Sequence, residues 1–247
     1  MTTAIAPRLM GKRILVTGAG KGIGRVTVET LISEGAEVIA ASRSAEDLAN
    51  LAHQTGCRPH IVDLADADAA RAAAEQALPL DGLVNNAGIA ELAPFLETTA
   101  ALFERIMAVN ARAPMLISQV VARDWIRRKA AGAIVNVSSL ASLWGTPDHA
   151  AYGASKAALD SLTMTMANEL GPFGIRANSI NPVVTLTPMA ERAWSDPAKA
   201  DTMLVRIPLR RFATPKEIAS VISFLLSEEA SMINGVILPI DGGFRAA

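Results

Sequence analysis

Short apolar runs rich in β-branched residues alternate along the chain with longer stretches in which apolar positions recur at helical spacing. The short runs lie at residues 13–17, 37–41, 61–62, 82–84, 133–137, 176–180 and 236–240. The longest helical patterns cover residues 99–128 and 151–170, and a shorter one covers residues 23–32. Strands that are apolar on both sides and separated by helices are typical of a parallel sheet covered on both faces. The pattern therefore predicts an α/β fold with about seven parallel strands.

Composition narrows the classes of protein that this chain can represent. Its 247 residues are 51% hydrophobic and 19% charged, which is enough apolar material for a full core. We find no repeat or linker, so we expect a single domain spanning residues 1–247. The 23 Lys and Arg against 24 Asp and Glu give a net charge of −1, which provides no basic excess for nucleic acid or an anionic membrane.

Targeting and metal signals are weak in the same sequence. It contains no signal peptide and no uncharged apolar stretch of about 18 residues, so we expect a cytoplasmic protein with no membrane partner. Cys57 is the only cysteine, and the three histidines do not stand at ligand spacing. No metal site is predicted.

A glycine-rich turn follows the first predicted strand. Gly18, Gly22 and Gly24 mark the junction between that strand and the helical pattern that follows it. Glycine allows the backbone to turn sharply and to approach a pyrophosphate, while the first N–H groups of the helix attract the same anion. A glycine trio alone is as typical of an ordinary turn. Its place in a strand–turn–helix unit predicts a dinucleotide site in a doubly wound, Rossmann-like sheet.

The end of the second predicted strand indicates which dinucleotide would bind. NAD sites usually carry an acidic residue there, which accepts hydrogen bonds from the ribose. In this chain the position is Ser42, and Arg43 follows it. The Arg43 guanidinium can pair with a 2′-phosphate, and Lys21 in the glycine-rich turn can add a second positive charge. We therefore expect NADP(H), although both cations would also suit a solvated surface.

Tyr152 and Lys156 stand four residues apart in the helical pattern 151–170, so both side chains would lie on one helix face. Tyr152 is the only tyrosine in the chain. A free phenol has a pKa of about 10, and an adjacent ammonium would lower that pKa toward neutrality. Ser139 could then hold a substrate oxygen while Tyr152 gives or takes a proton. Such a pair is common in structural helices, so the spacing alone does not establish catalysis.

Together these residues resemble the short-chain dehydrogenase/reductase family, and the resemblance covers nearly the whole chain. The matching motifs are Thr17-Gly18-x-x-x-Gly22-x-Gly24, Asp63-Leu64, Asn85-Asn86-Ala87-Gly88, Asn110, Ser139, Tyr152-Gly153-Ala154-Ser155-Lys156, and Asn181-Pro182 followed by Thr187. Their joint order is highly specific, whereas any one of them is not. The family's usual glycine after the proline is Val183 here, which leaves the backbone geometry of that loop open.

The resemblance implies a role for each matching position. Asn110, Ser139, Tyr152 and Lys156 would be catalytic, with Asn110 holding a water that returns a proton to Tyr152 through Lys156. The loop from Pro182 to Thr187 would hold the nicotinamide carboxamide. The residues implied to bind the cofactor are Gly18, Lys21, Gly22, Ile23, Gly24, Ser42, Arg43, Asp63, Leu64, Asn85, Ala87, Gly88, Tyr152, Lys156, Pro182, Thr185 and Thr187.

Substrate contacts are expected from Ser139 and Tyr152, and also from His149 and Trp194. His149 could equally cap the helix that follows it, and Trp194 could equally pack in a core or an interface. A substrate loop is expected at about residues 187–212, whose closure would shape the pocket. Within this loop, Ser195-Asp196-Pro197 predicts the start of a helix.

Within the family, the chain resembles most a group of tetrameric, NADPH-dependent reductases of short ketose sugars and α-dicarbonyls. The glycine-rich turn, Ser42-Arg43, residues 194–209 and the ending Gly242-Gly243-Phe244 carry this resemblance. It implies a homotetramer that takes a small carbonyl or alcohol substrate. Three alternatives stay open: a polyol or other secondary-alcohol dehydrogenase, a ketoacyl-carrier-protein reductase, and a catalytically silent nucleotide-binding protein.

Overall fold

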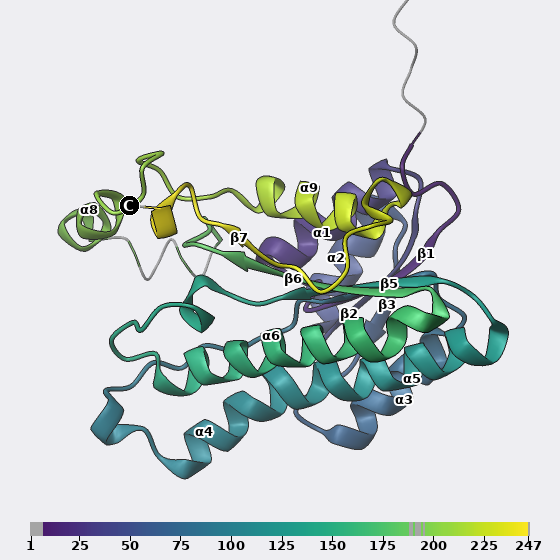
Figure 1. Cartoon of the computed structure of the whole chain (residues 1–247), viewed down its shortest axis with the longest axis horizontal. Coiled ribbons are helices and arrows are strands. Elements are labelled where there is room, and N and C mark those ends of the chain that lie inside the picture. The colour runs from purple at the N-terminus through teal and green to yellow at the C-terminus, as the bar shows by residue number, and fades with distance from the viewer. Residues whose placement is uncertain (1–6, 188–189, 191–193, 195, 247) are drawn as a thin grey trace, which may run out of the picture.

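The computed structural model describes residues 7–187, 190, 194 and 196–246 (Figure 1). In this part of the chain seven strands form one sheet in the order β3-β2-β1-β4-β5-β6-β7, and every neighbouring pair is parallel. The strands are β1 (Arg13–Thr17), β2 (Glu37–Ser42), β3 (Arg58–Ile61), β4 (Gly82–Asn85), β5 (Gly132–Val137), β6 (Ile175–Pro182) and β7 (Ile237–Ile240). The predicted parallel α/β sheet is confirmed. The third strand begins earlier than expected, because the apolar pair at 61–62 marks only its carboxyl end.

Helices cover both faces of this sheet (Figure 1). One face carries α1 (Gly22–Ser33), α2 (Ala45–Thr55) and α9 (Pro215–Leu226), and the other carries α3 (Ala67–Ala77), α5 (Ala113–Arg128) and α6 (Ala150–Leu170). Two further helices are α4 (Ala100–Met107) and α8 (Pro197–Leu204). Short 3₁₀ turns lie at η1 (Phe95–Glu97), η3 (Leu140–Ser142), η4 (Gly171–Phe173), η5 (Glu228–Ala230) and η6 (Phe244–Ala246). None of the described helices is long and apolar enough to cross a membrane.

The alternation of side chains along each strand produces two separate cores. Ile14 and Val16 of β1 pack on the side of α1 and α9, whereas Leu15 between them packs on the side of α3 and α5. The second core includes the fully buried Trp125 of α5, whose indole N–H donates to the backbone carbonyl of Leu80 at 2.7 Å. Both faces of the central strands are therefore buried, which explains why they read as continuous apolar runs.

The long helical pattern at residues 99–128 does not form one continuous α-helix. It is interrupted between α4 and α5 by a π-helical segment, η2 (Ala108–Arg112). Pro114 at the start of α5 has no N–H to donate to the carbonyl of Asn110 four residues earlier, so regular α-helical bonding cannot run through this point. Such π segments are frequent at functional sites. The segment contains Asn110, one of the predicted catalytic residues.

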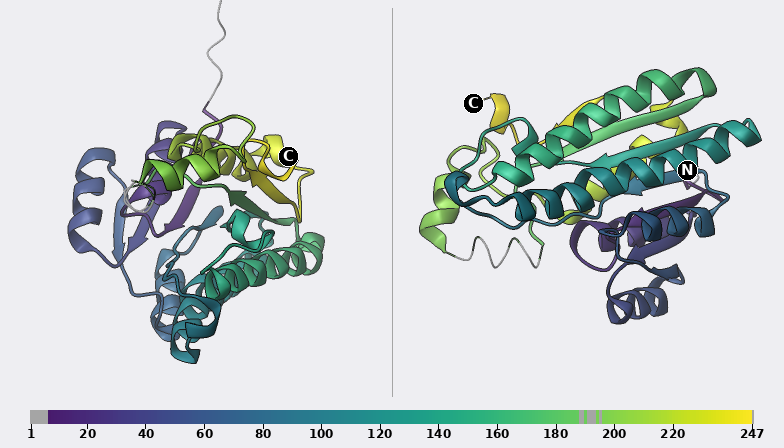
Figure 2. Two further views of the ribbon diagram at one scale, coloured as in Figure 1. Left: turned by 90° about the vertical axis from the view of Figure 1, so that its left-hand side faces the viewer. Right: turned by 90° about the horizontal axis from the view of Figure 1, so that it is seen from below.

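The carboxyl ends of the parallel strands meet along one edge of the sheet. Figure 2 (left) views the molecule from this side, where α8, η1 and the C-terminus lie in Figure 1. Turns that follow β1, β2, β4, β5 and β6 converge here, as expected for the ligand-binding edge of an open α/β sheet.

Candidate active site

The glycine-rich turn after β1 needs glycine at two positions for reasons of space and backbone angle. Gly18 has a φ of +66°, and a Cβ there would lie 2.7 Å from the Cα of Ala87. A Cβ on Gly24 would lie 2.2 Å from the carbonyl oxygen of Gly18. The turn therefore folds tightly against both its own helix and the β4 loop.

The beginning of α1 is left open by this turn. The N-cap residue Lys21 makes no side-chain capping bond, and the first turn of α1 contains no acidic residue. Its first N–H groups are thus available to an anion, and the dipole of the helix adds partial positive charge. This arrangement fits the pyrophosphate of a dinucleotide.

Asn86 joins the glycine-rich turn to the loop after β4. Its side-chain amide donates to the carbonyls of Thr17 and Gly18 at 3.0 and 3.1 Å. The hydroxyl of Thr17 in turn accepts from the backbone N–H groups of Asn86 and Ala87. Asn86 has no role predicted from its motif, and in the structure it links two walls of the site.

A cavity of about 500 Å³ runs along this edge of the sheet. Its walls come from the glycine-rich turn, the end of β2, the segment after β3, the loop after β4 and Val109. The residues that line it are Gly18, Gly20, Lys21, Gly22, Ile23, Ser42, Arg43, Ser44, Asp47, Val62, Asp63, Leu64, Asn86, Ala87, Gly88, Ile89, Val109 and Thr187. Its size is within the usual range for cofactor sites. The open helix terminus and the cations at the β2 end fit NADP(H).

Most predicted cofactor residues line this cavity, but six do not: Gly24, Asn85, Tyr152, Lys156, Pro182 and Thr185. Asn85 is buried beneath it, and its amide donates to Ser118 and Asn136. Pro182 lies at the end of β6, and the Thr185 hydroxyl donates to the carbonyl of Val183. Thr187, at the end of the same loop, does line the cavity.

The charges at the β2 end of the cavity are not equivalent. Lys21 forms an ion pair with Asp47 at 3.2 Å, and its side chain is 71% exposed. This pair and a hydrogen bond from Ser44 hold the pKa of Asp47 below its ordinary value, the Ser44 bond contributing most. Arg43 is exposed and makes no ion pair with any described residue. Its guanidinium is therefore the uncompensated positive charge at this end.

The predicted reactive residues meet at the other end of the cavity. Tyr152 and Lys156 lie on α6, and the Lys156 Nζ is 5.8 Å from the centre of the Tyr152 ring. Ser139, at the end of the segment after β5, forms a side-chain hydrogen bond with Tyr152. Gly88 lines the cavity, and a Cβ on it would lie 3.3 Å from the Lys156 Nζ. The lysine ammonium therefore stands directly behind the cavity wall.

Burial decides the protonation of both groups. Burial raises the pKa of Tyr152 above its ordinary value, and the hydrogen bond with Ser139 lowers it only in part. Burial also lowers the pKa of Lys156 to about 8, against the opposing effect of the negative charge on Asp160. The structure therefore raises the Tyr152 pKa instead of lowering it as expected from Lys156, because burial disfavours the phenolate more than the Ser139 hydrogen bond favours it. At neutral pH the site holds a protonated phenol beside a largely protonated lysine.

Asn110 lies in the π segment next to this pair. Its amide donates to the Ile89 carbonyl at 2.9 Å and to the Ser155 hydroxyl at 3.0 Å, and its carbonyl oxygen accepts from the Ile89 N–H. A Cβ on Gly88 would be 3.4 Å from that oxygen. Asn110 thus connects α6 to the loop after β4, one residue from the cavity wall.

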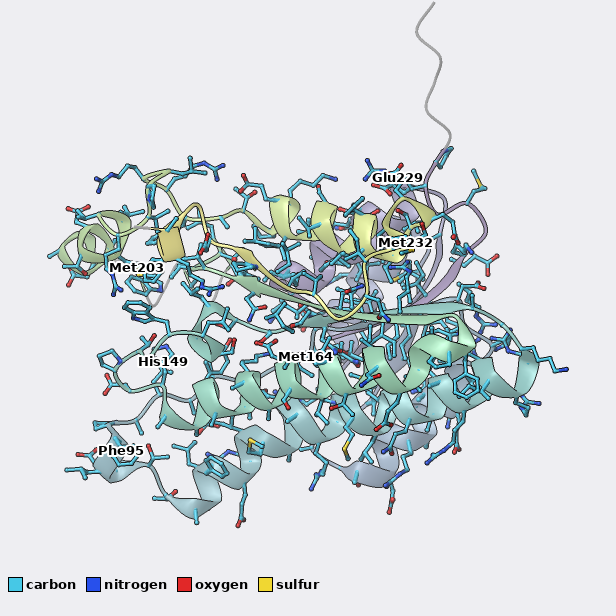
Figure 3. All side chains as sticks on the ribbon, viewed as in Figure 1. Phe95, His149, Met164, Met203, Glu229 and Met232 are labelled. Carbon is cyan, nitrogen blue, oxygen red and sulfur yellow. The ribbon has the colours of Figure 1, made fainter. Side chains whose placement is uncertain are left out.

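His149 stands at the amino end of α6, on the same side of the molecule as Met203 of α8 (Figure 3). Its ring is 6.0 Å from the Tyr152 ring, and its side chain makes no capping bond to α6. The Nδ1 lies 2.6 Å from the carbonyl of Pro147, which can only accept, so Nδ1 carries the proton. With this proton on Nδ1, the Nε2 atom can accept a hydrogen bond.

The expected substrate loop is described in part, because residues 188, 189, 191–193 and 195 lie outside the described residues. The predicted helix start is confirmed: Asp196 caps α8 by accepting from Ala198 N–H, and Pro197 is its first residue. Trp194 packs its ring 5.6 Å from that of Phe212. Nothing in these contacts brings Trp194 next to Tyr152.

Aromatic packing fastens the end of α8 to the rest of the site. The Arg206 guanidinium lies 4.8 Å from the Trp144 ring centre and 4.4 Å from that of Phe244. The two rings meet edge to face at 5.6 Å. Arg206 thus joins the loop after β5 and the C-terminal segment. Among the described residues, no group of three or more His, Cys, Asp or Glu could hold a metal ion.

The fold and these residues define a class of nucleotide-binding oxidoreductase, and comparison with known proteins agrees. A family model described as "Enoyl-(Acyl carrier protein) reductase" matches residues 18–245. The chain belongs to the short-chain dehydrogenase/reductase family.

Three relatives that match nearly the whole chain carry names of carbonyl or ketose reductases. The L-xylulose reductase of Bos taurus is 51% identical over 97% of this chain and 98% of its own length. The D-erythrulose reductase of Gallus gallus is 49% identical over 95% of this chain and 96% of its own length. The carbonyl reductase [NADPH] 2 of Sus scrofa is 45% identical over 96% of this chain and 98% of its own length.

Solved structures show the same fold with both nicotinamide cofactors. A protein from Agrobacterium tumefaciens, provisionally described as a 2-deoxy-d-gluconate 3-dehydrogenase with bound NADP, superposes with a TM-score of 0.92, 32% identity and coverage of 99% of this chain and 100% of that one. A 4-hydroxyisoleucine dehydrogenase complexed with NADH gives a TM-score of 0.92, 34% identity and coverage of 96% and 100%.

Proposed function

We propose that this chain is an NADPH-dependent reductase of small carbonyl compounds, with ketose sugars such as L-xylulose and α-dicarbonyls as its substrate class. The observation that carries the proposal is the convergence of Ser139, Tyr152 and Lys156 behind one end of a cavity whose other end exposes Arg43. Relatives named for L-xylulose, D-erythrulose and NADPH-dependent carbonyl reduction, at 51%, 49% and 45% identity, support the substrate class.

The chain's own residues would hold NADP(H) along the whole cavity. The open terminus of α1 would face the pyrophosphate, while Ser42 and Arg43 would face the 2′-phosphate. Asp63 and Leu64 would contact the adenine, and the loop from Pro182 to Thr187 would contact the nicotinamide end. When bound, NADPH supplies the hydride that reduces the carbonyl carbon.

Tyr152 supplies the proton. Its raised pKa keeps the phenol protonated at neutral pH, which suits a group that must donate to a carbonyl oxygen as that oxygen gains charge. The Ser139 hydroxyl would hold the same oxygen, and the Lys156 ammonium would stabilise the phenolate left after transfer. Asn110 would complete the path by which a proton returns to the site.

The substrate would lie between these groups and the substrate loop at about residues 187–212. His149 Nε2 would accept from a substrate hydroxyl, which favours hydroxylated carbonyl compounds. Trp194 would close the pocket from the loop side. Closure of this loop would exclude water from the reacting centre.

We also propose that residues 1–247 act as one domain within a cytoplasmic homotetramer. Exposed apolar side chains support association with further copies, among them Phe95 and Leu96 of η1, which are 79% and 94% exposed. Nucleic acid and membranes are not proposed partners, because the net charge of −1 provides no basic surface excess.

The experiment is a panel of carbonyl substrates with purified protein, following consumption of NADPH and, in parallel, NADH. We expect turnover of L-xylulose and diacetyl with a preference for NADPH. A reaction without a carbonyl compound controls for background oxidation of the cofactor. Binding of NADPH with no turnover across the panel would contradict the proposal and favour a catalytically silent nucleotide-binding protein.

The description of the matching family model favours one second candidate, a reductase of acyl groups carried on a carrier protein. An acetoacetyl thioester in the same panel tests it. The polyol or other alcohol dehydrogenase alternative is tested by running the reaction in the oxidative direction with NADP⁺ and xylitol.

A further inference from the structure

Asp160 is a buried carboxylate that the proposed chemistry does not use directly. It lies on α6 one helical turn after Lys156 and is only 6% exposed. No lysine or arginine among the described residues forms an ion pair with it. A buried charge in this situation is costly unless hydrogen bonds compensate it.

Three neutral donors from other elements supply this compensation. The hydroxyl of Ser142 in η3 donates to Asp160 Oδ2 at 2.6 Å, and the hydroxyl of Ser179 in β6 donates to Oδ1 at 2.6 Å. The side-chain amide of Asn181, also in β6, donates to Oδ2 at 2.8 Å. The carboxylate therefore joins α6, β6 and η3 at a single point.

Two of these donors also hold the backbone of Ser139. The Asn181 amide donates its second hydrogen to the Ser139 carbonyl oxygen at 3.0 Å. The Ser142 hydroxyl lies 2.8 Å from the same oxygen and shares its one hydrogen between this carbonyl and Asp160. Asn181 and Ser142 are themselves 2.7 Å apart. Asp160 thus anchors the two side chains that set the position of the serine whose hydroxyl meets Tyr152.

The charge of Asp160 also acts on Lys156, the nearest ammonium along α6. The titratable groups that face Lys156 are Tyr152 and Asp160, both on its own helix. From the other elements, the Val137 carbonyl lies 2.8 Å from Nζ, and this group does not titrate. Asp160 is therefore the one negative charge in the described surroundings that opposes loss of the lysine's proton on burial.

We propose that Asp160 is a positioning residue of the reductase site, whose buried carboxylate holds the Ser139 loop against α6 and β6 and supplies the counter-charge for Lys156. This inference rests on the proposed function. Asp160 would then have two separable effects. It would fix the position of Ser139 through Ser142 and Asn181, and its negative charge would favour the protonated form of Lys156 through space. A residue needed only for folding would produce neither.

The first test replaces Asp160 with Asn, which keeps the shape and removes the charge. Titration of lysines carrying ¹³C at Cε follows Lys156 by NMR in the protein without cofactor or substrate, with Lys156→Arg to assign its signal. In the unaltered protein we expect a midpoint near the pKa of about 8. In Asp160→Asn we expect the Lys156 midpoint to fall by about one pH unit. An elementary charge one helical turn away changes the pKa of a buried group by that order.

The kinetic consequence follows from that shift. At pH 8 the protonated fraction of Lys156 would fall from about one half to about one tenth, so kcat at this pH would fall about fivefold. In Asp160→Asn the decrease of kcat on the alkaline side would begin at a pH about one unit lower than in the unaltered protein. The dissociation constant of NADPH, measured by fluorescence, would stay within about twofold, because Asp160 does not line the cofactor cavity.

Two further variants separate these effects from stability. Ser142→Ala keeps the charge but breaks the link to the Ser139 carbonyl, so we expect kcat to fall at every pH without a shift of the profile or of the Lys156 titration. Asp124→Asn is the matched control, because Asp124 is another buried helix carboxylate, paired with Arg127 and Arg128 far from the site. It should change stability alone.

A Lys156 midpoint in Asp160→Asn equal to that of the unaltered protein would overturn the proposal, as would a Ser142→Ala variant with unchanged kcat. Should Asp160→Asn not fold, Ser142→Ala with unchanged kcat would still overturn it. Absence of turnover in the unaltered protein would refute the proposed function instead, and the lysine titration would still test the charge of Asp160 independently.

Discussion

Cofactor preference offers the sharpest test of how the β2 end of the cavity works. Replacement of Arg43 by Asp removes the only cation there that no described side chain neutralises, and puts a negative charge in its place. Lys21 compensates little, because it is largely exposed and already paired with Asp47 at 3.2 Å. NADPH and NADH differ by the 2′-phosphate alone, so the substitution should weaken the binding of NADPH and leave that of NADH almost unchanged.

The expected size follows from the type of contact. A charge-assisted guanidinium–phosphate pair contributes about 1.5–3 kcal/mol, which corresponds to about a 10- to 100-fold change in the dissociation constant. The added repulsion from the new carboxylate raises the loss further, so we expect NADPH to bind about 100-fold more weakly. The dissociation constant of NADH should change by less than about threefold.

Fluorescence titration of purified protein with each cofactor measures both constants without any turnover. Arg58→Asp is the matched control, since Arg58 is an exposed arginine at the opposite, amino end of β3 and lies outside the cavity. Equal losses for NADPH in both variants would indicate a general charge effect. An unchanged ratio of NADPH to NADH affinity in Arg43→Asp would refute the assignment of Arg43 to the 2′-phosphate.

Other expectations are more direct. The rate of carbonyl reduction should fall as the pH rises through about 8, because Lys156 loses its proton there, and a pH profile of kcat that is flat from pH 7 to 9 would contradict this. Trp125→Ala should lower the free energy of unfolding by about 3–5 kcal/mol in chemical denaturation, since the ring is fully buried. Arg206→Ala should raise the KM for the carbonyl substrate more than the dissociation constant of NADPH, because it frees the end of α8 from Trp144 and Phe244. Equal effects on both constants would show that this contact serves stability only.

The fold could be predicted from the sequence because its central strands are buried on both faces. The runs at residues 13–17, 82–84 and 133–137 coincide with β1, β4 and β5, since most side chains on both sides of these strands are apolar and buried. β3 was located less well, because it lies at the edge of the sheet and is mostly exposed. Its sequence therefore lacks the apolar signal.

The break at Asn110 could not be predicted from apolar periodicity, which continues through it from α4 to α5. The signal that marks it is Pro114, whose missing N–H leaves the Asn110 carbonyl without its α-helical donor. Pro114 is thus the sequence feature that separates α5 from the helical pattern before it.

The network around Asp160 was missed for a different reason. Spacing places Asp160 one turn after Lys156, but an acidic residue on a long helix usually faces solvent. Its partners Ser142 and Asn181 are distant in sequence and meet it only through the packing of η3 and β6 on α6. The direction of the Tyr152 pKa also escaped prediction, because it depends on how deeply the phenol is desolvated.

If the single tyrosine of the chain donates the proton in a carbonyl reduction, Tyr152→Phe should remove that step. The measurement is kcat for NADPH-dependent reduction of L-xylulose or diacetyl, together with the dissociation constant of NADPH in the same preparation. We predict that kcat falls by about 10²- to 10⁴-fold while NADPH binding stays within about twofold. Turnover within about threefold of the unaltered enzyme would contradict the account.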